Sequence, residues 1–215
     1  MTKRQAHDPA AFWEERYVSH RGESGRMWSG RVNAAVEHEV AGLPVGTALE
    51  LGSGEGGDAL WLASHGWTVT AIDISTNALA VAAEEAQLRG LSHRVTWVQA
   101  DLAKWHPSAE FDLVTAAFLH SPVELPREEI LRRAVAAVAP GGRLLIVGHG
   151  APPPGSTEPD HAHEIPPTAD EVLASLALPA DWTVETNGDF ERTMTWKGTR
   201  MTIADTVLRV RRPAG

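Results

Sequence analysis

Short apolar runs alternate with longer amphipathic stretches along the middle of this chain. The short runs are rich in apolar and β-branched residues, a composition typical of strands. The strand-like runs are Thr47–Leu51, Trp67–Asp73, Arg94–Gln99, Phe111–Ala116 and Arg143–Val147. Helical patterns lie between them, at Asp58–His65, from a Ser75 cap to near Gly90, and at Arg127–Ala139, where Pro140-Gly141-Gly142 stops the helix. This alternation predicts βαβ units and a parallel sheet.

The N-terminal part precedes this alternation and is expected to be helical. Asp8 and Pro9 are a typical cap and first turn for a helix that ends at Val18. A polar, glycine-rich loop then covers Ser19–Gly30, and a second helix is predicted from Arg31 to about Val40.

The C-terminal part changes character again. A loop rich in proline, glycine and histidine, Ala151–Pro167, is followed by a helix that Thr168 caps. Asp181–Thr186 and Met201–Arg211 predict two strands, and Asn187-Gly188 predicts a turn near the end of the first. We expect these two strands to close the parallel sheet as an antiparallel pair.

Composition narrows the class of protein. The chain has 215 residues, no cysteine and a formal net charge of −9, so we expect one domain without disulfides or thiolate sites and without a nucleic-acid-binding face. No run approaches membrane-spanning length and the N-terminus is polar, so a cytoplasmic protein with no membrane partner is expected. Within the single expected domain 1–215, a helical segment of residues 1–42 precedes the alternating core of residues 47–150, and residues 151–215 contain the loop, helix and closing strands.

The most informative segment for function is A-L-E-L-G-S-G-E-G-G, Ala48 to Gly57. A strand, a glycine turn and a helix N-terminus in that order hold nucleotide-like ligands in α/β proteins. Gly52-x-Gly54-x-x-Gly57 fits the dinucleotide fingerprint, whereas Glu50-x-Gly52-x-Gly54-x-Gly56 fits that of methyltransferases. A tight turn without a ligand is the third interpretation.

Two acidic residues follow later strands. Asp73 ends its strand 19 residues after Gly54, where a carboxylate accepts hydrogen bonds from ribose hydroxyls; capping the next helix is the alternative. Asp101 ends the run V-T-W-V-Q-A-D, where a carboxylate and the next backbone N–H can bind the adenine edge; a solvated loop aspartate is the alternative.

With Glu50, both aspartates and the Pro140-Gly141-Gly142 turn, residues 47–147 resemble the class I S-adenosylmethionine-dependent methyltransferases. The resemblance implies an α/β, three-layer Rossmann-like sandwich with a seven-stranded, mostly parallel sheet and one antiparallel strand. It also implies a set of cofactor contacts. These are Gly52, Ser53, Gly54 and Gly56 at the methionine part, Asp73 at the ribose, and Ile74, Asp101 and Leu102 at the adenine. Ser53 stands where many members have cysteine.

The N-terminal segments F-W-E-E-R-Y and M-W-S-G-R-V-N resemble the small bacterial methyltransferases grouped with the tellurite-resistance and thiopurine types. In such enzymes an N-terminal segment covers the cofactor. The resemblance implies that Trp28 packs over the sulfonium or the substrate, because an aromatic face favours a cation. Ordinary packing of Trp28 against the core is the alternative.

The segment after the fourth strand, Ala116 to Pro122, is expected to line the substrate crevice, with Ala117 and Phe118 at the cofactor. His120 is the first candidate for a general base and His149 the second; a structural loop histidine is the alternative for both. The D-H-A-H-E run, Asp160–Glu164, has metal-ligand chemistry but lies in a proline-rich loop, so we expect a solvated or lid-like loop rather than a metal site.

The hypothesis from sequence is therefore a methyltransferase that uses S-adenosyl-L-methionine and a small-molecule acceptor with an oxygen, nitrogen, sulfur or other chalcogen nucleophile. A nicotinamide- or flavin-dependent oxidoreductase and a non-catalytic nucleotide-binding sensor are the alternatives. The sequence identifies neither the acceptor nor the oligomeric state.

Overall fold

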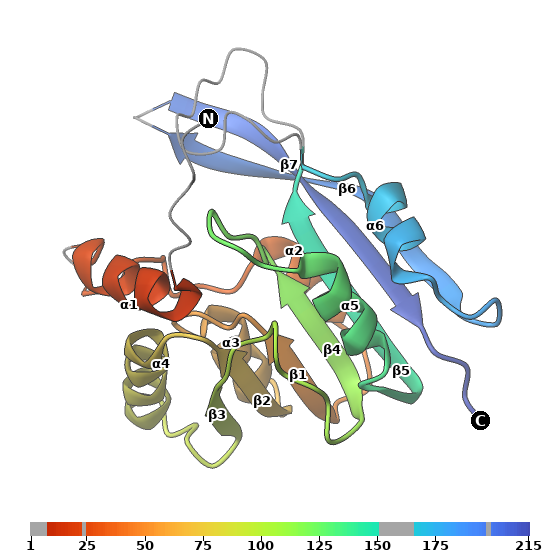
Figure 1. Ribbon diagram of the computed structural model, residues 1–215, viewed down its shortest axis with the longest axis horizontal. Coiled ribbons are helices and arrows are strands. Elements are labelled where there is room, and N and C mark those ends of the chain that lie inside the picture. The colour runs from red at the N-terminus through yellow and green to blue at the C-terminus, as the bar shows by residue number, and fades with distance from the viewer. Residues whose placement is uncertain (1–7, 23–24, 151–165, 197–198) are drawn as a thin grey trace.

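The computed structural model describes residues 8–22, 25–150, 166–196 and 199–215, and it contains a seven-stranded sheet (Figure 1). The strand order is β3-β2-β1-β4-β5-β7-β6, with β7 antiparallel to both of its neighbours and the other neighbouring strands parallel. The strands are β1 (Thr47–Leu51), β2 (Thr68–Asp73), β3 (Val95–Gln99), β4 (Phe111–Ala117), β5 (Val138–His149), β6 (Thr183–Trp196) and β7 (Thr199–Arg211). The predicted sheet, including its single reversed strand, is confirmed.

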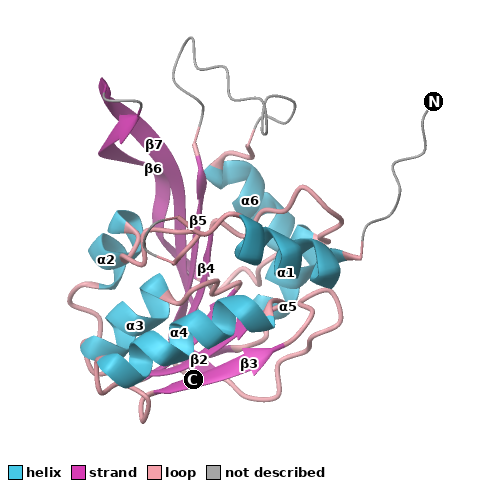
Figure 2. Cartoon of the chain, turned by 90° about the vertical axis from the view of Figure 1, so that its left-hand side faces the viewer, coloured by secondary structure: helices cyan, strands magenta, loops and turns pink. Residues whose placement is uncertain are grey.

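Helices cover both faces of this sheet and make the three layers. They are α1 (Pro9–Ser19), α2 (Ala34–Val40), α3 (Gly57–Ser64), α4 (Thr76–Leu88), α5 (Arg127–Val135) and α6 (Ala169–Leu176). Figure 2 shows α2, α3 and α4 on one face, while α5 and α6 pack on the other. The side chains of Asp8, Ser75 and Thr168 cap α1, α4 and α6 as predicted. The second helix begins later than predicted because Asn33 caps it.

The core has two halves, one on each face of the sheet. Leu49, Leu51 and Val114 point toward α5 and α6, and Ala48, Leu113 and Leu145 point toward α2 and α3. Successive strand residues thus bury both faces, as expected for a sheet sandwiched between helices. This rigid sheet holds the loops at the carboxyl ends of β1, β2 and β4 in place.

The helix predicted over Arg127–Ala139 is shorter than expected, and the predicted stop lies inside a strand. α5 ends at Val135, and β5 already begins at Val138 and runs through Pro140-Gly141-Gly142. Val138 pairs with Phe111, and the register with β4 then shifts. A Cβ on Gly142 would lie 2.9–3.0 Å from three backbone carbonyl oxygens, so glycine is required there for close packing of strands rather than to end a helix.

The turn predicted at Asn187-Gly188 is wrong. β6 continues through both residues, which pair with Leu208 and Val207 of β7. Asn187 donates a side-chain hydrogen bond to Asp170 of the helix that covers this edge (2.6 Å). Long-range pairing along β7 therefore overrides a local turn preference.

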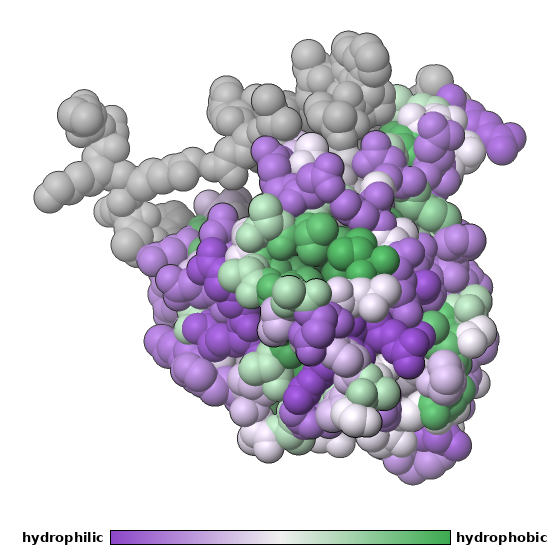
Figure 3. Space-filling model, turned by 90° about the vertical axis from the view of Figure 1, so that its right-hand side faces the viewer, coloured by the Kyte–Doolittle hydropathy of each residue, from purple (hydrophilic) through white to green (hydrophobic). Residues whose placement is uncertain are grey.

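The sheet edge at β6 is covered on one face by α6. Figure 3 views the molecule from this side and shows an apolar patch surrounded by polar residues. Leu173, Leu178 and Trp182 are partly buried against the core, and Val184 of β6 is 44 % exposed. The hydrophobic core therefore extends toward the surface at this edge.

Candidate functional site

The glycine loop between β1 and α3 has the backbone shape that its sequence demands. Gly52, Gly54 and Gly56 all have positive φ, at 75°, 52° and 76°. A Cβ on Gly52 would lie 2.8 Å from Leu119, and one on Gly54 would lie 2.9 Å from the hydroxyl of Tyr17. Side chains would fill this concave loop, so glycine keeps the backbone accessible there.

Asp73 at the end of β2 is attached directly to the glycine loop. Its carboxylate is 6 % exposed and accepts hydrogen bonds from the backbone N–H of Gly54 (2.7 Å) and of Ser75 (2.9 Å). Burial raises the pKa of Asp73, and these hydrogen bonds oppose the rise. The structure thus places a buried carboxylate beside the glycine loop, and contact of Asp73 with the ribose stays a prediction.

Glu50 and Ser53 contribute buried polar atoms that no described residue satisfies. Glu50 is 4 % exposed and Ser53 7 % exposed, and neither Glu50 Oε2 nor Ser53 Oγ has a hydrogen-bond partner in the described part of the chain. Burial, followed by the charges of Asp58 and Asp73, raises the pKa of Glu50. Leaving such atoms unmatched costs about 1–3 kcal/mol each, so a polar ligand that satisfies them is expected at this loop.

The adenine side of the predicted pocket is less clearly defined. Asp101 accepts a hydrogen bond from the Ala103 N–H (2.9 Å) and pairs with Lys104 (3.2 Å), so its side chain stabilises a local turn. Leu102 is 5 % exposed and packs in the core, and Ile74 is half-buried. The structure thus brings these three residues to the loops after β2 and β3, where their roles at adenine stay a prediction.

Both candidate general bases lie at the ends of β4 and β5. The His149 ring stacks on Phe118 with centroids 4.5 Å apart and on His120 at 5.5 Å. Phe118 has a φ of 49°, which is unusual for a non-glycine residue and is typical of a strained functional site. Ala117, the last residue of β4, is partly buried beside Val147.

The closing strands add two charged residues that sequence reasoning missed. The Arg192 guanidinium lies 6.0 Å from the centroid of the Phe118 ring. Asp205 is 1 % exposed and accepts hydrogen bonds from Arg192 at 2.5 and 3.3 Å. Asp205 also pairs opposite His149 across β5 and β7. Only the pairing of β5, β6 and β7 brings these residues together, so no local pattern identifies them.

The N-terminal helix α1 is attached to the loops after β2 and β4. Glu14 accepts hydrogen bonds from Ser75, Thr76 and Asn77 at the N-terminus of α4. Although burial opposes it, this bonding lowers the pKa of Glu14 to about 2. Trp13 Nε1 donates to the hydroxyl of Ser121 (3.2 Å).

Trp28 reaches the glycine loop from the segment between α1 and α2. The carboxylate of Glu55 accepts hydrogen bonds from the backbone N–H groups of Met27 (3.0 Å) and Trp28 (2.9 Å). The Trp28 indole lies beside Gly54 and is 52 % exposed, so it does not pack in the core. Contact with the cofactor or substrate stays its predicted role.

Asp58 was also missed, although it begins the predicted helix. It accepts a hydrogen bond from the Asn33 N–H (2.7 Å), and burial raises its pKa to about 6. An acidic residue in the first turn of a helix is a recognisable signal. Its link to the N-terminal segment is not visible in the sequence.

The D-H-A-H-E run, Asp160–Glu164, lies outside the described residues. Within residues 8–22, 25–150, 166–196 and 199–215, no three or more His, Cys, Asp or Glu side chains are grouped so as to hold a metal ion. The helices in these same ranges include none with the length and apolar composition needed to span a membrane.

Comparison with known sequences finds similarity to methyltransferases. Residues 48–142 match the model of a methyltransferase domain. Methyltransferase GfsG from Streptomyces halstedii is 37 % identical over 120 residues, which cover 54 % of this chain and 39 % of that protein. The 2-heptyl-1-hydroxyquinolin-4(1H)-one methyltransferase from Mycobacteroides abscessus is 32 % identical over 145 residues, covering 65 % and 60 %. The chain thus spans about two fifths to three fifths of the length of these relatives.

Comparison with solved structures agrees on the fold. The N-methyltransferase NodS from Bradyrhizobium japonicum, solved with S-adenosyl-L-homocysteine, superposes with a TM-score of 0.67. The match covers 96 % of this chain and 100 % of NodS at 19 % identity. At that identity the likeness establishes the architecture alone.

Proposed function

We propose that this chain, which is similar in sequence to methyltransferases, transfers a methyl group from S-adenosylmethionine to a small-molecule acceptor. One observation carries the proposal. The glycine loop holds the unmatched buried oxygens of Glu50 and Ser53 next to the carboxylate of Asp73. These acceptors suit an amino acid ammonium and ribose hydroxyls presented side by side.

The cofactor contacts follow from this arrangement. Asp73 binds the ribose hydroxyls, Glu50 and Gly52–Gly56 hold the methionine part, and the loops after β2 and β3 bind adenine. Trp28 covers the exposed side of the glycine loop. In this proposal residues 1–42 form the lid, 47–150 the cofactor-binding core and 151–215 the closing unit of a single domain.

The methyl acceptor binds beyond the ends of β4 and β5. S-adenosylmethionine supplies an activated methyl group, so alignment of the two reactants provides much of the acceleration. An alcohol acceptor needs its proton removed, for which His120 is the first candidate and His149 the second. A thiolate or heavier chalcogenide needs no base.

The names of some relatives support a small acceptor without identifying it. One relative is named for a hydroxyquinolone, and another, from Brassica oleracea, is a thiocyanate methyltransferase. The net charge of −9 argues against a nucleic-acid substrate, and a chain without cysteine suits the reducing cytoplasm. A cytoplasmic enzyme is therefore part of the proposal.

Titration calorimetry with S-adenosylhomocysteine tests the cofactor directly. We expect micromolar binding by the wild-type protein and about a hundredfold weaker binding by Asp73→Ala, which loses charge-assisted hydrogen bonds to the ribose. Asp189→Ala, an exposed aspartate of β6, is the matched control and keeps wild-type affinity. Absence of binding at high micromolar ligand by a folded sample would refute the proposal, as would selective binding of NAD(H).

The histidines are tested separately once a panel of oxygen, nitrogen and sulfur acceptors has identified a substrate. If His120 is the general base, His120→Ala lowers turnover by about 100-fold or more and leaves S-adenosylhomocysteine affinity unchanged. Unchanged turnover removes His120 from that role while the methyltransferase assignment stands. His149→Ala is then the next variant.

A further inference from the structure

The N-terminal helix places one more polar group over the glycine loop, the hydroxyl of Tyr17. Tyr17 is 5 % exposed, and its ring packs against Trp13 with centroids 5.8 Å apart. A Cβ on Gly54 would lie 2.9 Å from the Tyr17 oxygen, which is closer than any other atom to that position. The hydroxyl therefore lies over the middle of the loop that holds the cofactor.

This hydroxyl has a hydrogen to donate and no acceptor among the described residues. Its oxygen accepts a hydrogen bond from Trp28 Nε1 (3.4 Å), and this is the one side-chain hydrogen bond of Tyr17 within the described part of the chain. Burial, followed by the charge of Asp73, raises the pKa of Tyr17, so the phenol stays protonated at neutral pH. A buried donor of this kind needs an acceptor from a ligand.

The neighbouring side chains indicate which ligand group provides that acceptor. Glu50, Glu55 and Asp73 surround the loop, and as carboxylates they accept hydrogen bonds. In the proposed function, Glu50 and Asp73 accept from the ammonium and hydroxyl groups of S-adenosylmethionine, while Glu55 accepts from the Met27 and Trp28 N–H groups. The carboxylate of the cofactor's methionine part requires donors instead, and Tyr17 is the side chain that brings one to Gly54.

We propose that Tyr17 is a cofactor ligand whose hydroxyl donates a hydrogen bond to the carboxylate of the methionine part of S-adenosylmethionine. The proposal rests on the proposed function, because it requires that cofactor in the glycine loop. It adds a direct contact from α1, so the N-terminal segment recognises the amino acid end of the cofactor as well as covering it. Trp28 acts through Tyr17 by fixing the orientation of the phenol.

A pair of ligands that differ at one group tests the contact. S-adenosylmethionine and its decarboxylated form share the adenosine, sulfonium and amine but differ in the carboxylate. Tyr17→Phe removes the hydroxyl and keeps the ring. We expect calorimetry to show about tenfold weaker binding of S-adenosylmethionine by this variant, with binding of the decarboxylated ligand unchanged. Glu15→Gln, a change at an exposed position of the same helix, is the control and should not distinguish the two ligands.

A spectroscopic readout keeps the proposal testable if the variant does not fold. Tyr17 is the only tyrosine of the chain, so labelling with 3-fluorotyrosine gives a single ¹⁹F resonance. That resonance should shift further with S-adenosylmethionine than with the decarboxylated ligand. Equal losses of affinity for both ligands, no loss for either, or equal ¹⁹F shifts would overturn the Tyr17 contact. Binding of neither ligand by the wild-type protein would instead refute the proposed function and this contact with it.

Discussion

Two regions of this molecule bury acidic side chains, and the bonding partners of these side chains differ between the two regions. In the glycine-loop region, Glu50, Asp58 and Asp73 lie close together, and no arginine or lysine among the described residues bonds to them. Backbone N–H groups hold Asp58 and Asp73, and Glu50 keeps one unmatched oxygen. Burial raises the pKa of all three. A ligand that supplies positive charge and donors would compensate the burial of these carboxylates.

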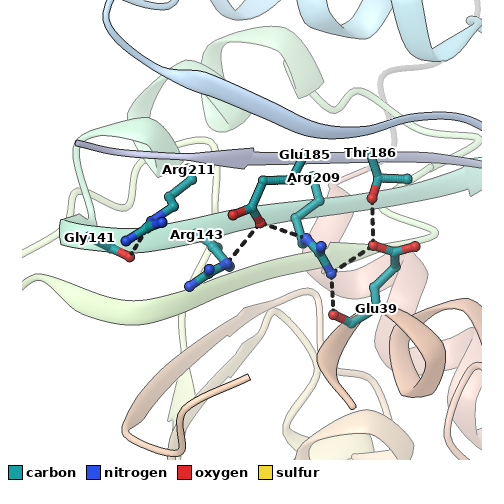
Figure 4. Close-up of polar contacts among 7 residues, drawn as sticks. All are labelled: Glu39, Gly141, Arg143, Glu185, Thr186, Arg209 and Arg211. Carbon is teal, nitrogen blue, oxygen red and sulfur yellow. Dashed lines mark hydrogen bonds and ion pairs between the residues drawn. The ribbon is translucent and has the colours of Figure 1, made fainter. Parts of the chain in front are cut away.

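The strands β5, β6 and β7, together with α2, instead contain an ion-pair network formed by the protein alone (Figure 4). This closing network consists of Glu39, Arg143, Glu185 and Arg209. Glu185 accepts hydrogen bonds from Arg143 (2.8 Å) and Arg209 (2.9 Å), and Glu39 accepts one from Thr186 and pairs with Arg209. The pKa of Glu185 is lowered by these two arginines despite its partial burial. Glu185 is the extra residue of a β-bulge in β6, which places its carboxylate between the arginines.

The difference shows that burial of a carboxylate does not by itself identify a binding site. What distinguishes the glycine loop is that its acids have no cationic partner within the described part of the chain, so only backbone hydrogen bonds offset their desolvation cost. We therefore expect variants of the closing network to affect stability and variants of the loop acids to affect ligand binding.

The largest expected effect comes from breaking the closing network. Arg209→Met leaves Glu39 and Glu185 without their shared cation, and we expect the free energy of unfolding to fall by about 3–5 kcal/mol. Affinity of the folded protein for S-adenosylhomocysteine should stay within about twofold of wild type. Urea unfolding followed by circular dichroism measures the first quantity and calorimetry the second.

Arg211→Met is the matched control for this variant. Arg211 lies on the same strand, is exposed, and has a 3.4 Å hydrogen bond to the Gly141 carbonyl. Its loss should change stability by less than about 0.5 kcal/mol. Equal effects of the two substitutions would show that the network does not stabilise the fold.

The pH dependence of stability gives the next effect, about 3 kcal/mol. Asp58 has a pKa of about 6 in the folded protein against 3.8 for an ordinary aspartate. Between these values the folded state binds more protons than the unfolded state, so the contribution of Asp58 to stability falls as pH rises. Relative to wild type, Asp58→Asn should therefore gain about 3 kcal/mol in free energy of unfolding from pH 4 to pH 7. A difference between variant and wild type that is independent of pH would contradict this account.

The link between α1 and α4 should give the smallest change. Glu14→Ala removes a cap from the α4 N-terminus and should cost about 1 kcal/mol of stability at pH 7. Because its folded pKa is lowered to about 2, this contribution should disappear as pH falls from 4.5 to 2. Glu15→Ala alters an exposed neighbour and should have no such effect. Equal losses from both variants in thermal unfolding would rule out the capping role.

The contrast between the two regions also explains how far sequence reasoning reaches. β1, the glycine loop, α3 and Asp73 follow one another closely, so short-range patterns predict the loop and its acid. The closing network cannot be found this way, because Arg209 bonds to Glu39 across 170 positions of the chain. The bulge at Glu185 and the continuation of β6 through Asn187 depend on pairing with β7, which a local turn preference does not include.

The N-terminal segment shows the same limit. Its motifs indicate a cover for the cofactor, and Trp28 does lie beside Gly54. The position of Tyr17 depends on how α1 docks on α4, through contacts such as Glu14 with Thr76. Docking between distant segments produces no periodic pattern in the sequence of either segment.

One paired measurement tests the central claim that the loop acids serve the cofactor and the closing acids serve the fold. Glu50→Gln and Glu185→Gln are compared at pH 7 for S-adenosylhomocysteine affinity and for free energy of unfolding. We expect Glu50→Gln to lose at least about tenfold in affinity with equal or higher stability, because it removes a buried, unmatched charge. Glu185→Gln should lose about 2–3 kcal/mol of stability with unchanged affinity. Unchanged affinity in Glu50→Gln, or an equal loss of affinity in Glu185→Gln, would contradict the account.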